Sequence, residues 1–263
     1  MNPDYWRVQK PDEPLFADVL WGKPVSRNLA GRLAIVGGNA RGFAAVAAGF
    51  ATAAEVGAGE IKIILPDVLK SQLPKTLADA IFAPSNPSGG FAKSAISELR
   101  AAADFANVVL FIGDSGQNSE TAGLVEKFLT DNREIKIVLT RDTVDLVKNF
   151  AENLLNRENT HLVVSLSQLQ KLFREVYYPR IITFSQGVKQ IAETLHKFTI
   201  TYPVALTLWH AGNLFIAKNG EVISQPFDEP LRVWSGEIAV REAVWQMWHK
   251  DIAKAVASAW AEL

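Results

Sequence analysis

Short apolar runs recur along the first two thirds of the chain, and each is followed by a longer segment with apolar residues on one side only. The runs are Arg32 to Val36 (RLAIV), Ile61 to Leu65 (IKIIL), Val108 to Ile112 (VVLFI), Ile135 to Leu139 and Leu162 to Val164. Near-continuous apolar runs are typical of parallel strands buried on both faces, whereas crossover helices need one apolar face. The alternation therefore predicts a three-layer α/β fold: a mainly parallel sheet with helices on both faces.

The segments between these runs have helical composition. Four of them are expected to form helices, at 44–56, 91–106, 119–129 and 144–155. The segment 238–263 is expected to close the chain as one long helix, because apolar residues recur in it at roughly helical spacing.

After about residue 201 the pattern changes to short strands separated by turns, in VALTLW, LFIAKNG and EVIS. Asn219-Gly220 is a favoured two-residue hairpin turn, so an antiparallel C-terminal hairpin is expected to complete the sheet. Residues 1–30 are rich in proline, tryptophan and charge, and we expect them to form an arm over the surface. No segment demands a second domain, so one domain is expected over 1–263.

Composition narrows the class of ligand. Hydrophobic residues make up 48% and charged residues 21%, which is typical of a folded globular protein. Lys plus Arg number 27 against 28 for Asp plus Glu, so the net charge of -1 favours a small molecule over nucleic acid or an anionic membrane. The absence of cysteine excludes disulfides and thiolate chemistry. The first residues lack the pattern of a signal peptide, and we expect a cytoplasmic protein.

Two glycine turns follow predicted strands. Gly37, Gly38 and Asn39 open one turn, and Gly113-Asp114 opens the other. Ligands of open α/β sheets bind at the carboxyl edge, where such turns let backbone approach an anion. Gly37 also reads as an ordinary strand-to-helix turn, and Asp114 as an ordinary turn residue.

Ser235-Gly236-Glu237 precedes the last predicted helix, where backbone amides and a carboxylate suit an anion and a base. Helix capping is the alternative function for these residues. Trp209 and His210 follow the strand VALTL and line either the crevice or the edge of the core. The four histidines are scattered, so we expect no metal site.

Together these pieces resemble the ADP/ATP-dependent NAD(P)H-hydrate dehydratases of the ribokinase-like superfamily. The similarity runs from about Trp21 to the last helix and is best in GRLAIVGGNARGFAAVAAGFATAAEVGAGEIKIILPD, which matches the opening strand, glycine turn, Ala-rich helix and second strand. VALTLWHAGNLFIAKNGEVIS is similar to the family's strand, Lys-Gly-Ala-Gly turn and hairpin.

The chain departs from the family at its motifs. Trp209 stands where the turn lysine is usual, and Gly113-Asp114-Ser115-Gly116 is shorter than the family's Gly-Pro-Gly-Leu-Gly loop. The Thr-Pro-His-Pro-Gly-Glu segment falls near 163–168 and is lost. Where the family has Gly-Gly-Thr-Gly-Asp, this chain has Val233-Trp234-Ser235-Gly236-Glu237. Glu237 therefore replaces the family's aspartate base and is one methylene longer, and Trp234 replaces a glycine.

The resemblance implies a ribokinase-like fold and phosphorylation of hydrated NAD(P)H by ATP or ADP, followed by elimination of phosphate. Mg²⁺ is compatible with this chemistry, although no ligand motif for it is visible. The implied base is Glu237. The implied nucleotide and phosphate contacts are Ser235, Gly236, Trp209, His210 and Gly212, and the implied substrate contacts are Gly37, Gly38, Asn39, Gly113 and Asp114.

Because several motif positions are lost, the hypothesis is a divergent relative that binds a nucleotide or dinucleotide, with activity weakened or lost. Two alternatives stay open: an active NAD(P)H-hydrate dehydratase or related small-molecule kinase, and a non-catalytic scaffold that binds a partner. Trp245, Trp248 and Trp260 indicate packing or an oligomer surface, and we expect a homo-oligomer.

Overall fold

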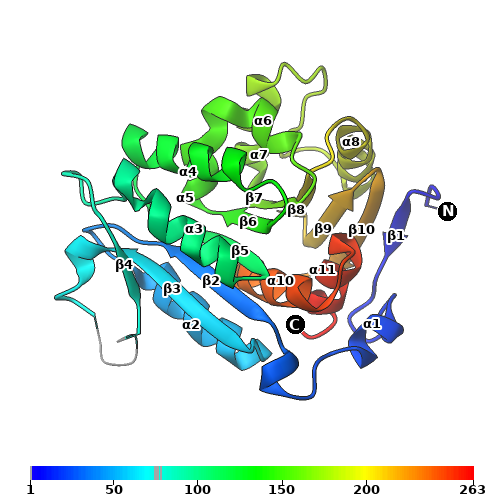
Figure 1. Ribbon diagram of the computed structural model, residues 1–263. Helices are drawn as coiled ribbons and strands as arrows, with labels where there is room; N and C mark the ends of the chain where they lie inside the picture. Colours follow the sequence, from blue (N-terminus) through cyan, green and yellow to red (C-terminus); the bar gives the residue numbers. More distant parts are fainter. Residues whose placement is uncertain (1, 74–76, 78) are drawn as a thin grey trace.

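A single ten-stranded sheet forms the middle of the molecule in the computed structural model, which describes residues 2–73, 77 and 79–263 (Figure 1). The strand order is β1-β10-β9-β8-β7-β6-β5-β2-β3-β4. The strands are β1 (Trp6–Val8), β2 (Arg32–Gly37), β3 (Glu60–Pro66), β4 (Ile81–Ala83), β5 (Val108–Gly113), β6 (Lys136–Thr140), β7 (Thr160–Val164), β8 (Ala205–His210), β9 (Asn213–Lys218) and β10 (Glu221–Pro226).

The direction of the strands agrees with the prediction. Strands β4, β3, β2, β5, β6, β7 and β8 are parallel, while β8, β9 and β10 are joined antiparallel. The five predicted apolar runs and VALTL all lie in this sheet, and the residues of β5 are buried throughout. The predicted mainly parallel α/β sheet with a C-terminal antiparallel hairpin is therefore confirmed.

Helices cover both faces of the sheet and bury one apolar cluster on each (Figure 1). On one face lie α1 (Ala17–Trp21), α2 (Ala44–Val56), α10 (Glu237–Trp248) and α11 (Ile252–Trp260). On the other lie α3 (Ile96–Phe105), α4 (Ser119–Asp131), α5 (Asp142–Val147), α6 (Ala151–Leu155), α7 (Leu166–Glu175) and α8 (Val188–Thr201). A short helix, α9 (Pro230–Trp234), leads into α10.

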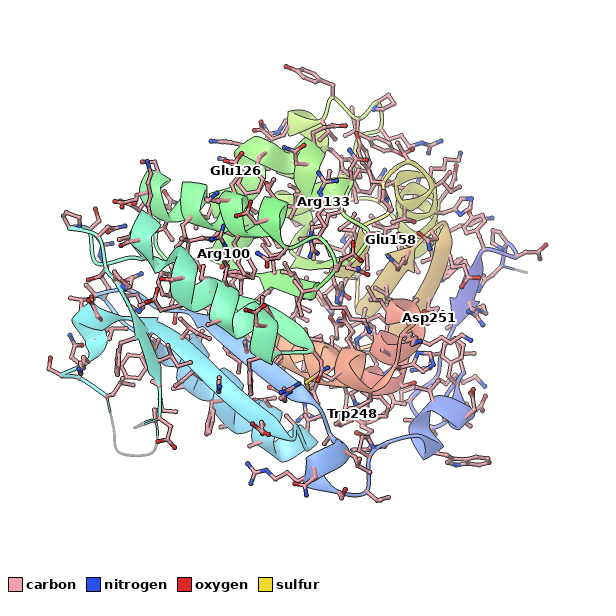
Figure 2. The ribbon with its side chains drawn as sticks, viewed as in Figure 1. Arg100, Glu126, Arg133, Glu158, Trp248 and Asp251 are labelled. Carbon is pink, nitrogen blue, oxygen red and sulfur yellow. The ribbon has the colours of Figure 1, made fainter. Side chains whose placement is uncertain are left out.

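The predicted closing helix is wrong as one continuous element, because it breaks between α10 and α11. His249 has an extended backbone, and the side chain of Asp251 accepts a hydrogen bond from the amide of Lys254 to start α11. Figure 2 labels Trp248 at the end of α10 and Asp251 before α11. Asp is a favoured residue at a helix start, so this cap begins a second helix. Trp245 and Trp260, at 1% exposure each, pack inside the protein.

Other predicted boundaries also move. The helix expected at 91–106 begins at Ile96, and the one expected at 144–155 is divided among α5, a 3-10 turn at Lys148–Phe150 and α6. Helices α7 and α8 were not predicted. No helix in the described part of the chain is long and apolar enough to cross a membrane.

The predicted arm at 1–30 is more than a surface covering, although Met1 lies outside the described residues. Strand β1 joins the sheet in parallel with β10, pairing Trp6 with Val222. Inside this edge the indole of Trp6 donates to Ser224 Oγ at 2.9 Å.

Candidate functional site

The two glycine turns meet at the carboxyl edge of the sheet. The amide of Gly38 donates to the carbonyl of Gly113 at 3.0 Å, and a Cβ on Gly37 would collide with that carbonyl. This close approach is open to glycine because glycine carries no Cβ. The turns after β2 and β5 therefore form one unit, as strand order alone predicts.

Gly236, the third predicted glycine, lies near the same turns, because Gly236 and Gly113 both pack against Arg141, which directly follows β6. A Cβ on Gly113 would lie 3.1 Å from Cβ of Arg141, and a Cβ on Gly236 would lie 3.2 Å from its Cδ. Both glycines have positive φ, 99° and 93°. The Arg141 side chain thus lies between the loop after β5 and the start of α10.

Arg141 is held from several sides. One guanidinium nitrogen donates to Asp114 Oδ1 at 2.7 Å, and the other donates to the carbonyl of Ser235 at 3.1 Å. The Gln168 side chain donates to the Arg141 carbonyl at 2.7 Å. The backbone of Arg141 has φ 55° and ψ -141°, a region that costs a non-glycine residue on the order of 1–3 kcal/mol. These contacts stabilise a conformation that local preference opposes.

Asp142 occupies the amides of the loop after β5. Its two carboxylate oxygens accept from the amides of Asp114, at 2.8 Å, and Gly116, at 3.1 Å. An anion binding to this loop would have to displace this internal carboxylate. The amides of Asp114 and Gly116 therefore have an internal partner, and substrate contact by Gly113 and Asp114 stays a prediction.

Asp114 and Asn39 join the two turns. Asp114 Oδ2 accepts from the amide of Ala45 in the first turn of α2 at 2.8 Å, and Asn39 donates to the Asp114 carbonyl at 2.5 Å. Asp114 itself has φ 56°. A carboxylate at the amino end of a helix is electrostatically favourable, so Asp114 caps α2 while it pairs with Arg141.

A pocket of about 280 Å³ opens beside Arg141, at the ends of β6 and β7. Its lining combines polar groups with Trp234, at the end of α9. Its lining residues are Thr140, Arg141, Asp142, Asp145, Val163, Val164, Ser165, Ser167, Gln168, Val233 and Trp234. This volume is near the lower end of the range for ligand pockets.

Glu237, the predicted base, is bound by two arginines. Its Oε1 accepts from Arg232 Nη2 at 2.6 Å and from Arg241 Nε at 3.1 Å. Partial burial raises the pKa of Glu237, but these hydrogen bonds and charges outweigh it and leave the pKa below its ordinary value. A carboxylate with a lowered pKa is a weaker proton acceptor.

Ser235 and Gly236 form the junction between α9 and α10. The Ser235 hydroxyl donates to the Arg232 carbonyl at 3.1 Å and lies 3.4 Å from the amide of Glu237. The Ser235 side chain therefore makes local capping contacts, while its carbonyl receives Arg141. Gly236, in the left-handed conformation, starts α10.

Three predicted nucleotide residues lie at the end of β8 and in the turn that follows it. Trp209 donates its indole N–H to the Phe227 carbonyl at 2.8 Å, and its ring meets Trp234 edge-on at 6.0 Å. His210 Nε2 lies 2.7 Å from the Gln186 carbonyl, and the Gly212 carbonyl accepts from the Phe227 amide. Trp209 thus touches a residue of the pocket, whereas His210 and Gly212 hold the neighbouring turn.

A buried polar cluster lies beneath α10. His161 contacts Thr207 at 2.9 Å and the Gln246 side chain at 2.8 Å, while Glu242 Oε1 accepts from Thr207 and Trp260. Glu242 Oε2 is buried without a hydrogen-bond partner in the described structure. Desolvation raises the pKa of Glu242 to about 8 and lowers that of His161 to about 3, so both are neutral at pH 7.

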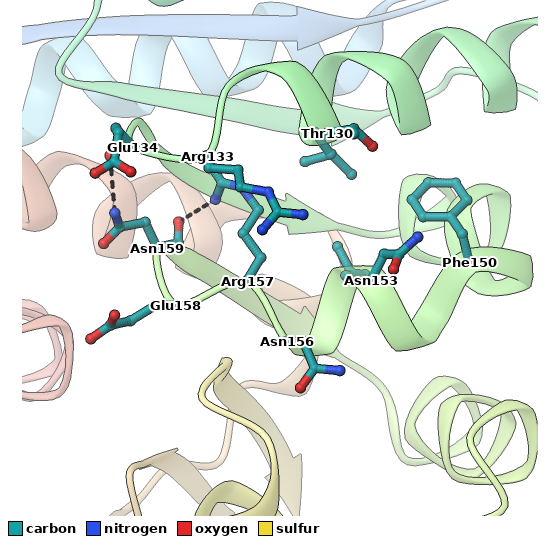
Figure 3. Close-up of a pocket in the computed structure, with 11 residues that line it drawn as sticks. Thr130, Arg133, Glu134, Phe150, Asn153, Asn156, Arg157, Glu158 and Asn159 are labelled. Carbon is teal, nitrogen blue, oxygen red and sulfur yellow. Dashed lines mark hydrogen bonds between the residues drawn. The ribbon is translucent and has the colours of Figure 1, made fainter.

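A second pocket, of about 320 Å³, lies at the opposite edge of the sheet, between the ends of α4 and α6 (Figure 3). Arg157 lies within it at 6% exposure and donates to four oxygens, which belong to Asn132, Ile135, Asn159 and Thr160. Burial lowers the pKa of Arg157 to about 10, so it stays charged. Its hydrogen bonds identify it as a clamp on the surrounding loops.

Sequence reasoning missed Arg141, Asp142 and Gln168. The signal for the first two was present, because they come one residue after the run 135–139, at a predicted carboxyl edge. Within residues 2–73, 77 and 79–263, no group of three or more His, Cys, Asp or Glu side chains is arranged to hold a metal ion.

No protein-family model matches the sequence, and no curated protein matches it either. Solved structures do match. A ribokinase-like superfamily protein from Enterococcus faecalis V583 superposes with a TM-score of 0.73 at 14% identity, covering 98% of this chain and 86% of that one.

Two further structures have the same arrangement. ADP/ATP-dependent NAD(P)H-hydrate dehydratase from Bacillus subtilis, co-crystallized with ATP/Mg²⁺, has a TM-score of 0.59 at 14% identity, covering 89% of this chain and 78% of that one. Pyridoxal kinase from Bacillus subtilis, in an ADP complex, has a TM-score of 0.54 at 12% identity, covering 87% and 88%. The chain therefore has the ribokinase-like α/β fold that its sequence resembles.

Proposed function

We propose that the protein binds a nucleotide, ATP or ADP, in the crevice beside Arg141, and that the chemistry implied by the resemblance is weakened or lost. The support for binding is the site itself. The turns after β2 and β5, the end of β6 and the start of α10 meet at the carboxyl edge, beside a pocket that contains a guanidinium and an indole. Of the solved structures with this fold, one was co-crystallized with ATP/Mg²⁺ and another is an ADP complex, which fits the proposed ligand.

The observation that carries the loss of chemistry is the pair of arginines on Glu237. A base for phosphoryl transfer must accept a proton from the substrate hydroxyl, and its best pKa lies near the working pH. Arg232 and Arg241 instead favour the ionised carboxylate and occupy Oε1, one of its two oxygens. The same contacts suit a structural function at the start of α10.

Two alternatives follow from the same site. An active NAD(P)H-hydrate dehydratase or small-molecule kinase would require a substrate that draws Glu237 from its arginines. A non-catalytic scaffold would use another surface, in a cytoplasmic homo-oligomer or with a different partner. Nucleotide binding and turnover together separate the three.

The test combines calorimetry with a repair assay on the purified protein. ATP and ADP, each with and without Mg²⁺, are titrated first, and hydrated NADH and NADPH are then supplied with each nucleotide. Binding without turnover supports the proposal. Turnover that Glu237→Gln abolishes would establish the active enzyme instead, and absence of binding would favour the scaffold.

A further inference from the structure

We infer that Arg141 anchors the phosphate of the ligand and that Asp114 is its built-in competitor, an internal carboxylate that occupies the guanidinium until a phosphate replaces it. The inference rests on the proposed function, because it names the group that receives the nucleotide. The sequence did not predict the pairing of Arg141 with Asp114, and the family motifs described above do not include an arginine at this position.

The first argument is the charge of the pocket. Among the described residues that line it, Arg141 is the one cation, whereas Asp142 and Asp145 are acidic. Lys171, nearby, is paired with Asp145 at 2.5 Å. A phosphate entering this pocket therefore depends on Arg141 to offset carboxylates that would otherwise repel it.

The second argument is the hydrogen-bonding capacity of the guanidinium. It has five N–H donors, and the described structure supplies one carboxylate oxygen and one carbonyl as its acceptors. Its side chain is 27% exposed. A guanidinium binds phosphate best through two parallel hydrogen bonds, and a single oxygen of Asp114 uses less than that capacity.

The third argument is that Asp114 is fixed without Arg141. Its other carboxylate oxygen accepts from Ala45, and its amide donates to Asp142. The carboxylate therefore stays in place when the guanidinium leaves it. Arg141 packs between two glycines and already lines the pocket, so its guanidinium can exchange Asp114 for a phosphate while Asp114 keeps its other contacts.

An aromatic residue in the lining indicates the kind of ligand. Trp234 is 52% exposed and lines the same pocket, so an indole and the cation share this pocket. Aromatic bases stack on indoles in a way that tolerates different bases. The expected ligand class is a phosphate attached to an aromatic base, with the phosphate on Arg141 and the base toward Trp234.

The experiment measures affinity for ATP, pyrophosphate and adenosine by calorimetry. Arg141→Gln should weaken ATP and pyrophosphate binding by about tenfold or more and leave adenosine unchanged, since it removes a charged hydrogen-bonding partner. Asp114→Asn keeps an acceptor for Ala45 but removes the competing charge, and should tighten pyrophosphate binding several-fold. Arg100→Gln is the matched control, because Arg100 forms an exposed 2.7 Å pair with Asp131 on the surface (Figure 2).

A second variant guards against misfolding. Arg141→Gly suits the positive φ at this position, so it should remain folded by circular dichroism and melting temperature while losing phosphate affinity. Unchanged ATP and pyrophosphate binding in both Arg141 variants would overturn the inference and leave the proposed function standing. Binding by Asp114→Asn but not by the wild type would support the inference and contradict the proposed function. If no variant and no wild type binds, both fail.

Discussion

Replacing Glu242 with glutamine should remove a stability loss that the wild-type protein suffers as pH rises. Glu242 is fully buried beneath α10, and desolvation raises its pKa to about 8 from an ordinary value of 4.5. Between these two values the folded state binds a proton that the unfolded state releases. Stability therefore falls with rising pH through this range, by about 1.4 kcal/mol per pH unit.

His161 contributes the opposite slope. Its pKa is lowered to about 3 from 6.5, so between these values the unfolded state binds the extra proton and stability rises with pH. The two slopes cancel from pH 4.5 to 6.5. Above pH 6.5 Glu242 acts alone, and the pair costs the wild type about 2 kcal/mol by pH 8.

The variant Glu242→Gln resembles the neutral acid and keeps acceptors for Thr207 and Trp260. Urea unfolding of the two proteins, followed by tryptophan fluorescence, gives the difference in free energy of unfolding at pH 5, 6.5 and 8. Between pH 6.5 and 8, the free energy of unfolding of the variant should rise by about 2 kcal/mol relative to that of the wild type. Glu126→Gln, at an exposed site on α4, should give no such trend (Figure 2). Parallel pH profiles for wild type and Glu242→Gln would refute a proton held by Glu242.

Three further predictions concern the site and the second pocket. If Glu237 is the base, Glu237→Gln should lower any turnover by about 10²-fold with nucleotide affinity little changed. If Glu237 only supports α10, the same change should lower the stability of the fold by about 1 kcal/mol or less without a catalytic effect. A repair assay and thermal melting on the same protein decide between the two. Gly236→Ala should destabilise the protein by about 1 kcal/mol or more, because φ is 93° and the new Cβ lies 3.2 Å from Arg141 Cδ. Gly123→Ala is the control, because its new Cβ enters open space inside α4 and should stabilise the protein slightly. Equal melting temperatures for the two variants would contradict this geometry. Arg157→Met should destabilise by about 3 kcal/mol or more in urea, because it leaves one buried and three partly buried acceptors without their donor. Arg133→Met, at an exposed residue of the same pocket, should change stability by about 0.5 kcal/mol or less; similar losses in both variants would show that Arg157 is no clamp.

The sheet was predictable because its strands are buried on both faces, which leaves uninterrupted apolar runs in the sequence. RLAIV and VVLFI each appear as strands with boundaries within one residue of those expected. The helices were less predictable. In α7 the polar face dominates the composition, although Ser165 and Gln168 form a capping box at its start that was visible as a Ser-x-x-Gln spacing.

The site was predictable to the extent that topology determines it. Parallel strands bring their carboxyl ends to one edge, so the approach of Gly37 to Gly113 follows from their places after β2 and β5. The pairing of Arg141 with Asp114 joins loops 27 residues apart and has no periodicity to signal it. Glu237 has one predictable partner and one that was not predictable. Arg241 lies four residues on, a spacing that predicts an ion pair on a helix, whereas Arg232 reaches Glu237 across the turn at Gly236.

The pairing of β1 with β10 has a consequence for how the protein assembles during synthesis. Trp6 and Val222 are neighbours in the finished sheet, yet the ribosome makes one more than two hundred residues before the other. Strand β1 therefore has no partner in this sheet until β10 has been translated. Until then, the apolar side of Trp6 is exposed to chaperones and to other nascent chains. Addition of this strand covers the edge of β10 with an edge strand of three residues, and so short an edge offers little backbone to the strands of another molecule.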